Sequence, residues 1–126
     1  MNALSGQNGF SLLEMVIAMG LFAIGLMGLA LMTSGLMSNN ATARNRADAT
    51  RLSQNKLEAL GSGAYSEIGY SLETDIDALG ISGNGVFQRE VAVAEKSGPV
   101  RKEVTVTVSW EGEGTHRVVL KAVFAP

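Results

Sequence analysis

The sequence has no cysteine, one histidine and one tryptophan among its 126 residues. Without cysteine, neither a disulfide framework nor a thiolate metal site can form. The lone His116 cannot supply a metal site built from several histidines, and its place near a turn predicts an exposed side chain. Glu73, Asp75 and Asp77 resemble a calcium-binding loop only faintly, because no complete ligand set follows them. We therefore expect no metal and no cofactor.

Positive charge is scarce in the C-terminal half. From residue 61 to the end, six Lys and Arg residues oppose nine Asp and Glu residues, a net charge of −3 (6 − 9). A nucleic-acid-binding domain needs a basic surface to hold phosphates, and this half lacks one. The sequence also shows no nucleophile paired with a base. We therefore expect no nucleic-acid partner, no small-molecule substrate and no enzymatic activity.

The most informative segment is an apolar run of 28 residues from Phe10 to Met37, in which Glu14 is the only ionisable side chain. As a helix it would extend ~40 Å, which exceeds the ~30 Å hydrocarbon core of a bilayer. No proline interrupts it. We predict that residues 10–37 form a transmembrane helix. The glycines at 20, 25 and 28 could serve close packing or let the helix stretch on assembly, and the sequence leaves both possibilities open.

The apolar run fits a buried helix or a signal peptide less well. A buried helix of a soluble protein could be equally apolar, but the remaining ~90 residues could hardly surround so long a rod. A secretory signal peptide would need a basic start and a shorter apolar stretch. The first nine residues, MNALSGQNG, contain no Lys or Arg. They are short and polar, which favours a leader rather than a folded segment.

Residues 38–60 favour an amphipathic continuation of the same helix. They combine good helix formers with charges of both signs, and Ala49, Leu52, Leu57 and Leu60 are the apolar positions. The glycines of Gly61-Ser-Gly63 are typical of a helix end. We predict one helix from about Phe10 to Leu60.

The remainder predicts a small antiparallel sheet. Residues 61–85 are rich in Gly and Ser and indicate a loop region with one short turn of helix around 72–79. Period-two alternation then predicts three strands around residues 87–93, 104–110 and 118–124. Turn residues at 97–99 and 112–114 predict hairpin connections. Because only residues 38–60 could cover the apolar face of this sheet, we predict an α+β roll formed by residues 38–126.

The sequence Gly9-Phe10-Ser-Leu-Leu-Glu14 begins the apolar run. A carboxylate inside a membrane helix costs roughly 2.5–3.5 kcal/mol at the bilayer centre, so it needs a partner. Cleavage after Gly9 would create an ammonium group on Phe10 that could pair with Glu14, in the same chain or in a neighbour. The alternative is that Glu14 lies at the headgroup level of a plain anchor.

These residues resemble a known signature. GFSLLEMVIAM at 9–19 is similar to the cleavage and methylation motif of type IV pilins and type II secretion pseudopilins. The resemblance implies that a prepilin peptidase cuts between Gly9 and Phe10, removes the leader 1–9 and methylates Phe10. It also implies that Glu14 sets assembly register by pairing with a neighbour's amine. Glycine before the cut suits a narrow protease cleft, since it lacks Cβ.

Residues 7–60 resemble PilV-type minor pilins in particular, through LFAIGLMGLALM at 21–32 and LSQNKLEAL at 52–60. The resemblance implies a single-pass protein of the bacterial inner membrane, with its C-terminal part in the periplasm and later in a surface pilus. Two features depart from the family: the leader has no basic residue, and the C-terminal part has no disulfide. By the positive-inside rule alone, Arg44, Arg46 and Arg51 would place the C-terminal part in the cytoplasm.

The leading hypothesis is therefore a minor pilin of a type IV pilus, assembled through helix packing with other minor pilins and the major pilin. One alternative is the I-type minor pseudopilin of a type II secretion system, which differs in machine rather than in fold. Another is an adhesin-like tip subunit whose loops bind a surface.

Overall fold

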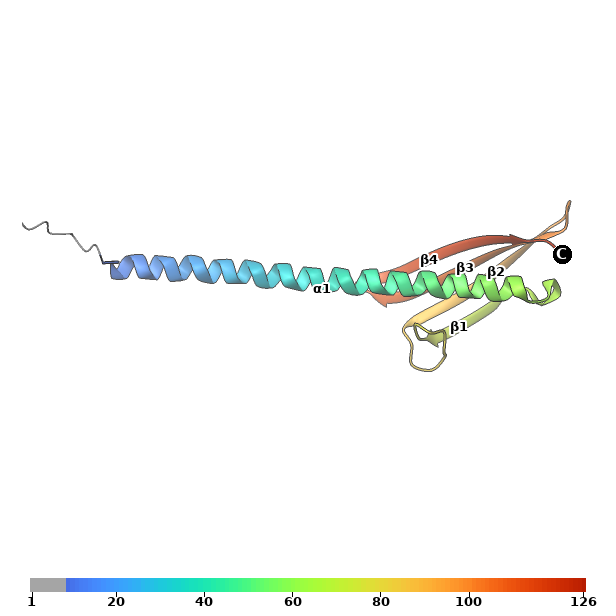
Figure 1. The fold of residues 1–126 in the computed structure, drawn as a ribbon, viewed down its shortest axis with the longest axis horizontal. Coiled ribbons are helices and arrows are strands. Elements are labelled where there is room, and N and C mark those ends of the chain that lie inside the picture. Colours follow the sequence, from blue (N-terminus) through green and yellow to red (C-terminus); the bar gives the residue numbers. More distant parts are fainter. Residues whose placement is uncertain (1–8) are drawn as a thin grey trace, which may run out of the picture. The chain divides into compact units, whose positions relative to one another are not determined.

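The computed structural model describes residues 9–126 and divides the chain into two compact units, Met1–Asn39 and Asn40–Pro126. One long helix, α1 (Leu12–Ser62), is followed by a short 3-10 turn, η1 (Tyr65–Glu67), and four strands (Figure 1). The first unit contains the apolar part of α1. The second contains the rest of α1 together with the strands. The leader 1–9, apart from Gly9, lies outside the described residues.

Helix α1 confirms the prediction of one uninterrupted helix, with both ends shifted by two residues. Its last turn closes through a hydrogen bond of 3.2 Å from the Gly63 amide to the Ala59 carbonyl. Every residue from Gly9 to Met37 is exposed in the single chain. No described part of the chain covers the apolar run, so it is not a core helix of this protein.

The four strands form one antiparallel sheet in the order β1-β2-β3-β4. They are β1 (Ser71–Ile76), β2 (Phe87–Lys96), β3 (Arg101–Gly112) and β4 (Gly114–Phe124). Both predicted hairpins are confirmed, with residues 97–100 joining β2 to β3 and Glu113 joining β3 to β4. Gly98 and Gly114 have φ angles of 93° and 101°, a left-handed region that glycine enters without steric cost.

The prediction of three strands was wrong, because β1 adds a fourth. Leu72, Ile76 and Leu79 have helical spacing, which favoured a helical turn, yet residues 71–76 pair with β2. Only Ile76 of the three is buried, and its burial comes from a register shift between Glu73 and Ile76. Asp75 lies within this shift with a φ of 55°. A bulged edge strand lacks strict alternation, so the sequence pattern did not reveal it.

The core lies between the second part of α1 and one face of the sheet, as predicted. Ala49 and Leu52 of α1 are buried together with the inward residues of the strands, which include Ile76, Phe87, Val91, Val104, Val106, Val108 and Trp110. The rings of Phe87 and Trp110 meet edge to face at 6.0 Å. Each large aliphatic or aromatic side chain buried here contributes roughly 1.5–3 kcal/mol.

His116 is not fully exposed, contrary to the prediction. It lies directly across β3 and β4 from Trp110, and the two rings stack at a centroid distance of 5.4 Å with an interplanar angle of 20°. Period-two alternation places His116 on the same face as Val118, so stacking on the indole half-buries it.

Candidate functional site

The predicted processing site lies at the start of α1. Gly9 and Phe10 precede the helix, and Ser11 caps it. The Ser11 hydroxyl accepts the Glu14 amide at 3.2 Å, and the Ser11 carbonyl accepts the Met15 amide at 3.1 Å. Ser-x-x-Glu is the spacing of a capping box, which explains why the helix begins immediately after Ser11.

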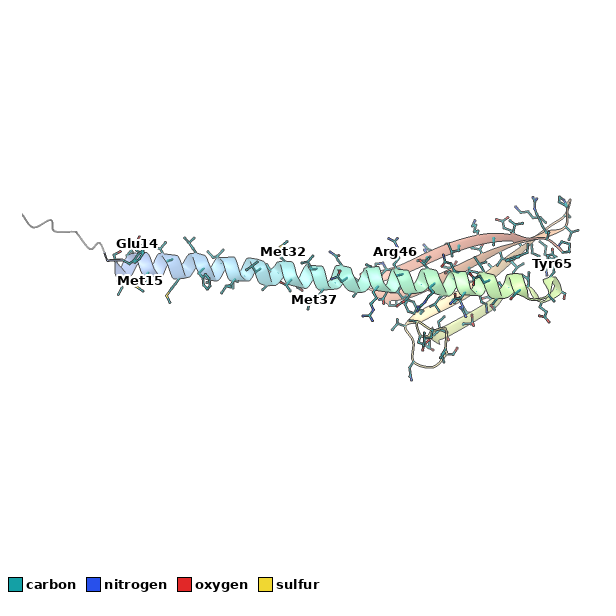
Figure 2. The ribbon with its side chains drawn as sticks, viewed as in Figure 1. Glu14, Met15, Met32, Met37, Arg46 and Tyr65 are labelled. Carbon is teal, nitrogen blue, oxygen red and sulfur yellow. The ribbon has the colours of Figure 1, made fainter. Side chains whose placement is uncertain are left out.

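Glu14 lies in the first turn of α1, where the positive end of the helix dipole favours a negative charge (Figure 2). Its side chain is exposed, and it has no ion-pair partner among residues 9–126. Phe10 and Glu14 are four residues apart, as are Glu14 and Ala18. Phe10, Glu14, Met15, Ala18 and Met19 line a shallow apolar depression on this side of the chain.

The fold does not require glycine at position 9. A Cβ built on Gly9 would meet no atom within 4 Å, and the same holds for Gly20, Gly25 and Gly28. Packing within the single chain therefore explains none of these four glycines. For Gly9, this agrees with a requirement set by a processing enzyme rather than by folding. For the other three, close packing against a neighbour and stretching of the helix both remain open.

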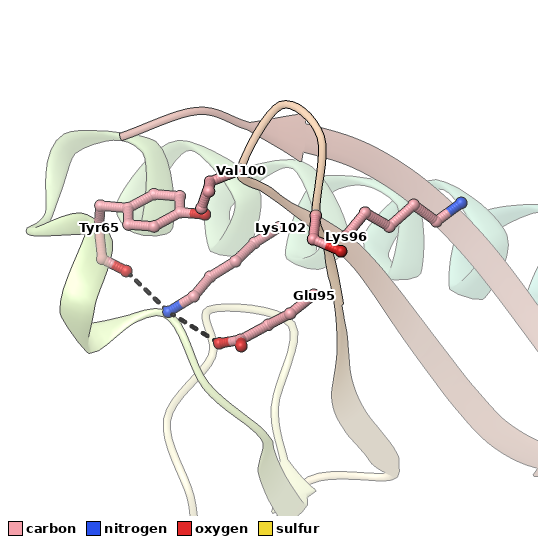
Figure 3. Close-up of a pocket in the computed structure, with 6 residues that line it drawn as sticks. Tyr65, Glu95, Lys96, Val100 and Lys102 are labelled. Carbon is pink, nitrogen blue, oxygen red and sulfur yellow. Dashed lines mark hydrogen bonds and ion pairs between the residues drawn. The ribbon is translucent and has the colours of Figure 1, made fainter.

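A cleft lies within the second unit, Asn40–Pro126. Tyr65, Lys102 and the turn after β2 line it, together with Glu95, Lys96, Ser97 and Val100 (Figure 3). The buried Lys102 ammonium donates to the carbonyls of Tyr65 and Ile68 at 3.0 and 2.9 Å, and lies 4.8 Å from the Tyr65 ring centroid. These two backbone carbonyl groups satisfy the Lys102 ammonium, so Lys102 holds the segment after α1 in place.

Two of the three acidic residues that faintly resemble a calcium loop, Glu73 and Asp77, have side chains engaged within the chain. Glu73 accepts two hydrogen bonds from Arg89, and one Asp77 carboxylate oxygen accepts the amides of Leu79 and Ile81 at 2.9 Å each. No group of three or more metal-ligating side chains occurs in residues 9–126.

The sequence reasoning missed the buried cations Arg89 and Lys102. The sequence did indicate that these two cations are buried. The period-two alternation of the strands places Arg89 between Phe87 and Val91, and places Lys102 beside Val104, on the inward face. A charged residue at an inward position predicts a buried partner. Both side chains fix the fold around α1 and lie far along the chain from Glu14.

The comparisons with known proteins address the N-terminal segment. A family model described as the prokaryotic N-terminal methylation motif matches residues 4–30. The N-terminal segment of this chain is therefore similar to that of type IV pilins and pseudopilins. The matched residues include the predicted junction, Glu14 and most of the apolar run. Neither the comparison with curated proteins nor that with solved structures returned a match.

The motif implies that this pilin-like protein is processed by a prepilin peptidase. Proteins of this kind are typically structural rather than catalytic. By length and composition α1 could cross a membrane, since its most apolar 18-residue window has a mean hydropathy of 2.4 and none of that window is buried. The exposed apolar helix and the motif are together consistent with anchoring in the inner membrane. They are common to pilus subunits and secretion pseudopilins.

Proposed function

We propose that the chain is a minor pilin of a type IV pilus, similar to the PilV type. Prepilin peptidase cuts between Gly9 and Phe10 and methylates the new Phe10 amine. Residues 10–37 then anchor the protein in the inner membrane and pack against the corresponding helices of other minor pilins and the major pilin. Residues 38–60 cover the sheet, and residues 61–126 complete the periplasmic domain, which later reaches the cell surface in the pilus.

The observation that supports this proposal is the exposed apolar run with an unpaired acid in its first turn. Leaving such a helix exposed to water is unfavourable, so it needs lipid or other helices around it. Inside a bundle of such helices Glu14 would have no headgroup beside it, and an unpaired carboxylate costs roughly 2.5–3.5 kcal/mol at full membrane depth. A cation brought by a neighbouring subunit offsets that cost only when the subunits assemble.

Cleavage would supply that cation. The new Phe10 amine stands at the start of the helix, four residues from Glu14 and beside the depression that both residues line. In a bundle of parallel helices, an axial offset of one turn, about 5 Å, would bring one chain's amine level with the next chain's carboxylate. The pair thereby sets register between neighbours, because a different offset leaves both charges unpaired in an apolar setting.

The test is to express Glu14→Ala and Glu14→Asp in a piliated strain that lacks the chromosomal gene. Processing depends on Gly9 and should persist, so the mature mass and the membrane level should match the wild type. Recovery with sheared pili should be lost for Glu14→Ala and reduced for Glu14→Asp, whose carboxylate reaches less far. Breaking a buried pair can cost ~3–5 kcal/mol, although access to solvent or headgroups lowers this value.

Glu58→Ala is the matched control, because Glu58 is an exposed acid on the same helix without an ion-pair partner in the described chain. It should be recovered with pili at the wild-type level. Normal recovery of Glu14→Ala would contradict the pairing role. Measuring secretion in the same strains separates the two machines, since loss of secretion with intact pili would identify a pseudopilin instead.

A further inference from the structure

Arg44 and Arg46 form a second charged feature of α1, beyond the apolar run. Both side chains are exposed, and neither has an ion-pair partner among residues 9–126. The other cations of the helix are engaged, since Arg51 contacts Asp48 and the Ala78 carbonyl, and Lys56 contacts Glu73. No ion pair within the described residues therefore compensates the positive charge of Arg44 and Arg46.

The arginine pair has a definite spacing from Glu14. Thirty residues of the continuous helix α1 separate Glu14 from Arg44, which corresponds to about 45 Å. A bilayer with its headgroup regions is ≈40–45 Å thick. When Glu14 lies among the headgroups of one leaflet, Arg44 therefore reaches those of the other. The part of the apolar run that lies between them, residues 15–37, would extend ~35 Å and exceeds the ~30 Å hydrocarbon core, so apolar burial alone leaves the depth of the helix undetermined.

The placement of the two arginines around the helix suits a lipid surface. Residues two apart lie about 160° from one another around the helix, so these side chains flank α1 on opposite sides. A partner protein would contact one side, whereas headgroups surround the helix. Helical side chains also lean toward the N-terminus, which directs both guanidinium groups back toward the apolar run. Guanidinium groups bind phosphate through paired hydrogen bonds.

We propose that Arg44 and Arg46 bind the phosphates of anionic phospholipids and so fix the depth of the unassembled subunit in the membrane. Glu14 and the arginine pair bound the span at its two ends. Incorporation into a filament would break the arginine–phosphate contacts while Glu14 gains its partner. This inference rests on the membrane anchoring in the proposed function, but not on pilus assembly.

The absence of cysteine allows a direct measurement, because one introduced cysteine carries the only label. The full chain bearing Thr42→Cys with a nitroxide would be reconstituted in phosphatidylcholine vesicles with and without phosphatidylglycerol, in phosphate-free buffer. Depth is read from the relative collisions with oxygen and a water-soluble nickel complex. With phosphatidylglycerol the label should lie at headgroup depth. In Arg44→Gln/Arg46→Gln it should shift away from that depth by on the order of one helical turn, ~5 Å.

The matched control is Arg117→Gln/Lys121→Gln, which removes two exposed cations from β4 and should leave the depth unchanged. Salt at 1 M should weaken the effect of phosphatidylglycerol, because the Debye length falls to about 3 Å. The proposal would be overturned if the depth of the Thr42→Cys label changed neither with the lipid charge nor with the Arg44/Arg46 substitutions. An effect seen only at high protein density, with spin–spin broadening, would assign the arginines to a neighbouring subunit and also overturn it.

Two further measurements complete the test. The first distinguishes a free anion from a lipid headgroup, and the second checks that the helix is anchored in the membrane. Inorganic phosphate that fixes the label equally well in pure phosphatidylcholine would show that the pair binds a free anion, which contradicts lipid anchoring. A label at Ala23→Cys, in the middle of the apolar run, should lie deep in the hydrocarbon. Should it read as water-exposed, membrane anchoring itself fails, and with it the depth proposal. Normal depth at Ala23 with an unresponsive Thr42 label overturns only the role of the arginines.

Discussion

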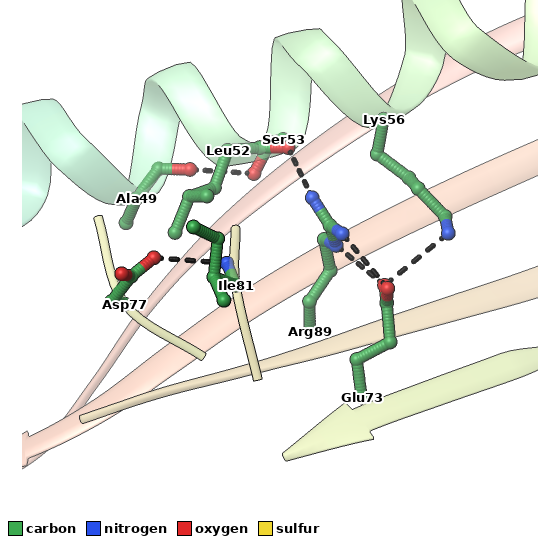
Figure 4. Close-up of polar contacts among 8 residues, drawn as sticks. All are labelled: Ala49, Leu52, Ser53, Lys56, Glu73, Asp77, Ile81 and Arg89. Atoms are coloured by element: carbon green, nitrogen blue, oxygen red, sulfur yellow. Dashed lines mark hydrogen bonds and ion pairs between the residues drawn. The ribbon is translucent and has the colours of Figure 1, made fainter. Parts of the chain in front are cut away.

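Arg89 and Glu73 face each other across β2 and β1, and two hydrogen bonds of 2.7 and 2.9 Å join the guanidinium to the carboxylate. The same guanidinium donates to the Leu52 carbonyl of α1 at 3.2 Å, and Lys56 of α1 lies 3.2 Å from the same carboxylate (Figure 4). One buried cation thus joins the edge strand β1 to the helix that covers the sheet. This relationship holds β1 in place despite its bulge.

The first prediction concerns acid stability. Hydrogen bonds from Arg89, above all, lower the pKa of Glu73 below its ordinary value of 4.5, with further lowering by Lys56 and partial opposition from burial. A carboxyl group whose pKa is lower in the folded state stabilises the fold fully above its unfolded pKa. That contribution should be lost as the pH falls from about 4.5 through the lowered value. Urea unfolding in detergent, followed by the near-UV signal of Trp110, measures it.

Glu73→Gln should remove the contribution of Glu73 to the acid dependence and lower the free energy of unfolding at neutral pH. Breaking a buried ion pair costs ~3–5 kcal/mol, and we expect about 2–3 kcal/mol because 29% of the Glu73 side chain is exposed. Some acid dependence should remain, since a hydrogen bond from Lys96 also lowers the pKa of Glu103. Glu58→Gln serves as the matched control and should behave as the wild type. An unchanged acid profile in Glu73→Gln would show that the pair does not stabilise the fold.

The second prediction concerns the turn between β1 and β2. The Gly85 amide donates to the Asp75 carbonyl at 2.9 Å, and a Cβ at position 85 would overlap the backbone of Ile76. Gly85→Ala should therefore displace β1 and cost ~1–3 kcal/mol or more. Gly69→Ala is the control, because a Cβ there would meet only one atom, at 4.0 Å. Equal unfolding midpoints for the two variants would refute this account of the turn.

Residues 10–60 show how far a sequence pattern reaches. The apolar run, its cap and the amphipathic continuation are encoded locally, by periodicity and by residues such as Ser11 and Gly63, so the helix could be predicted, whereas the roles of Gly9, Phe10 and Glu14 stay predictions. Strand β1 could not be, because Ile76 becomes buried through a bulge and Glu73 is held by Arg89, sixteen residues away. The position of His116 likewise depends on a ring from a neighbouring strand. Long-range pairing of this kind has no local pattern.

The third prediction concerns which part of α1 belongs to the core. A chain that starts at residue 38 should be soluble and fold cooperatively, because it retains Ala49 and Leu52. A chain that starts at residue 61 should aggregate, since it exposes the inward face of the sheet. Size-exclusion chromatography and thermal unfolding compare the two. A monomeric, cooperatively folded chain from residue 61 would show that α1 is dispensable for the core.

The central claim is that this chain is a prepilin processed at Gly9–Phe10, and one measurement tests it most directly. The protein is isolated from the membranes of cells with an active prepilin peptidase, and its intact mass and N-terminal fragment ions are determined. The account predicts a mature chain that begins at Phe10 and carries one methyl group on its amine. Gly9→Ala, which the fold itself accommodates, should reduce the processed fraction. A membrane protein that retains Gly9 and the residues before it, in cells that process other prepilins, would contradict the account.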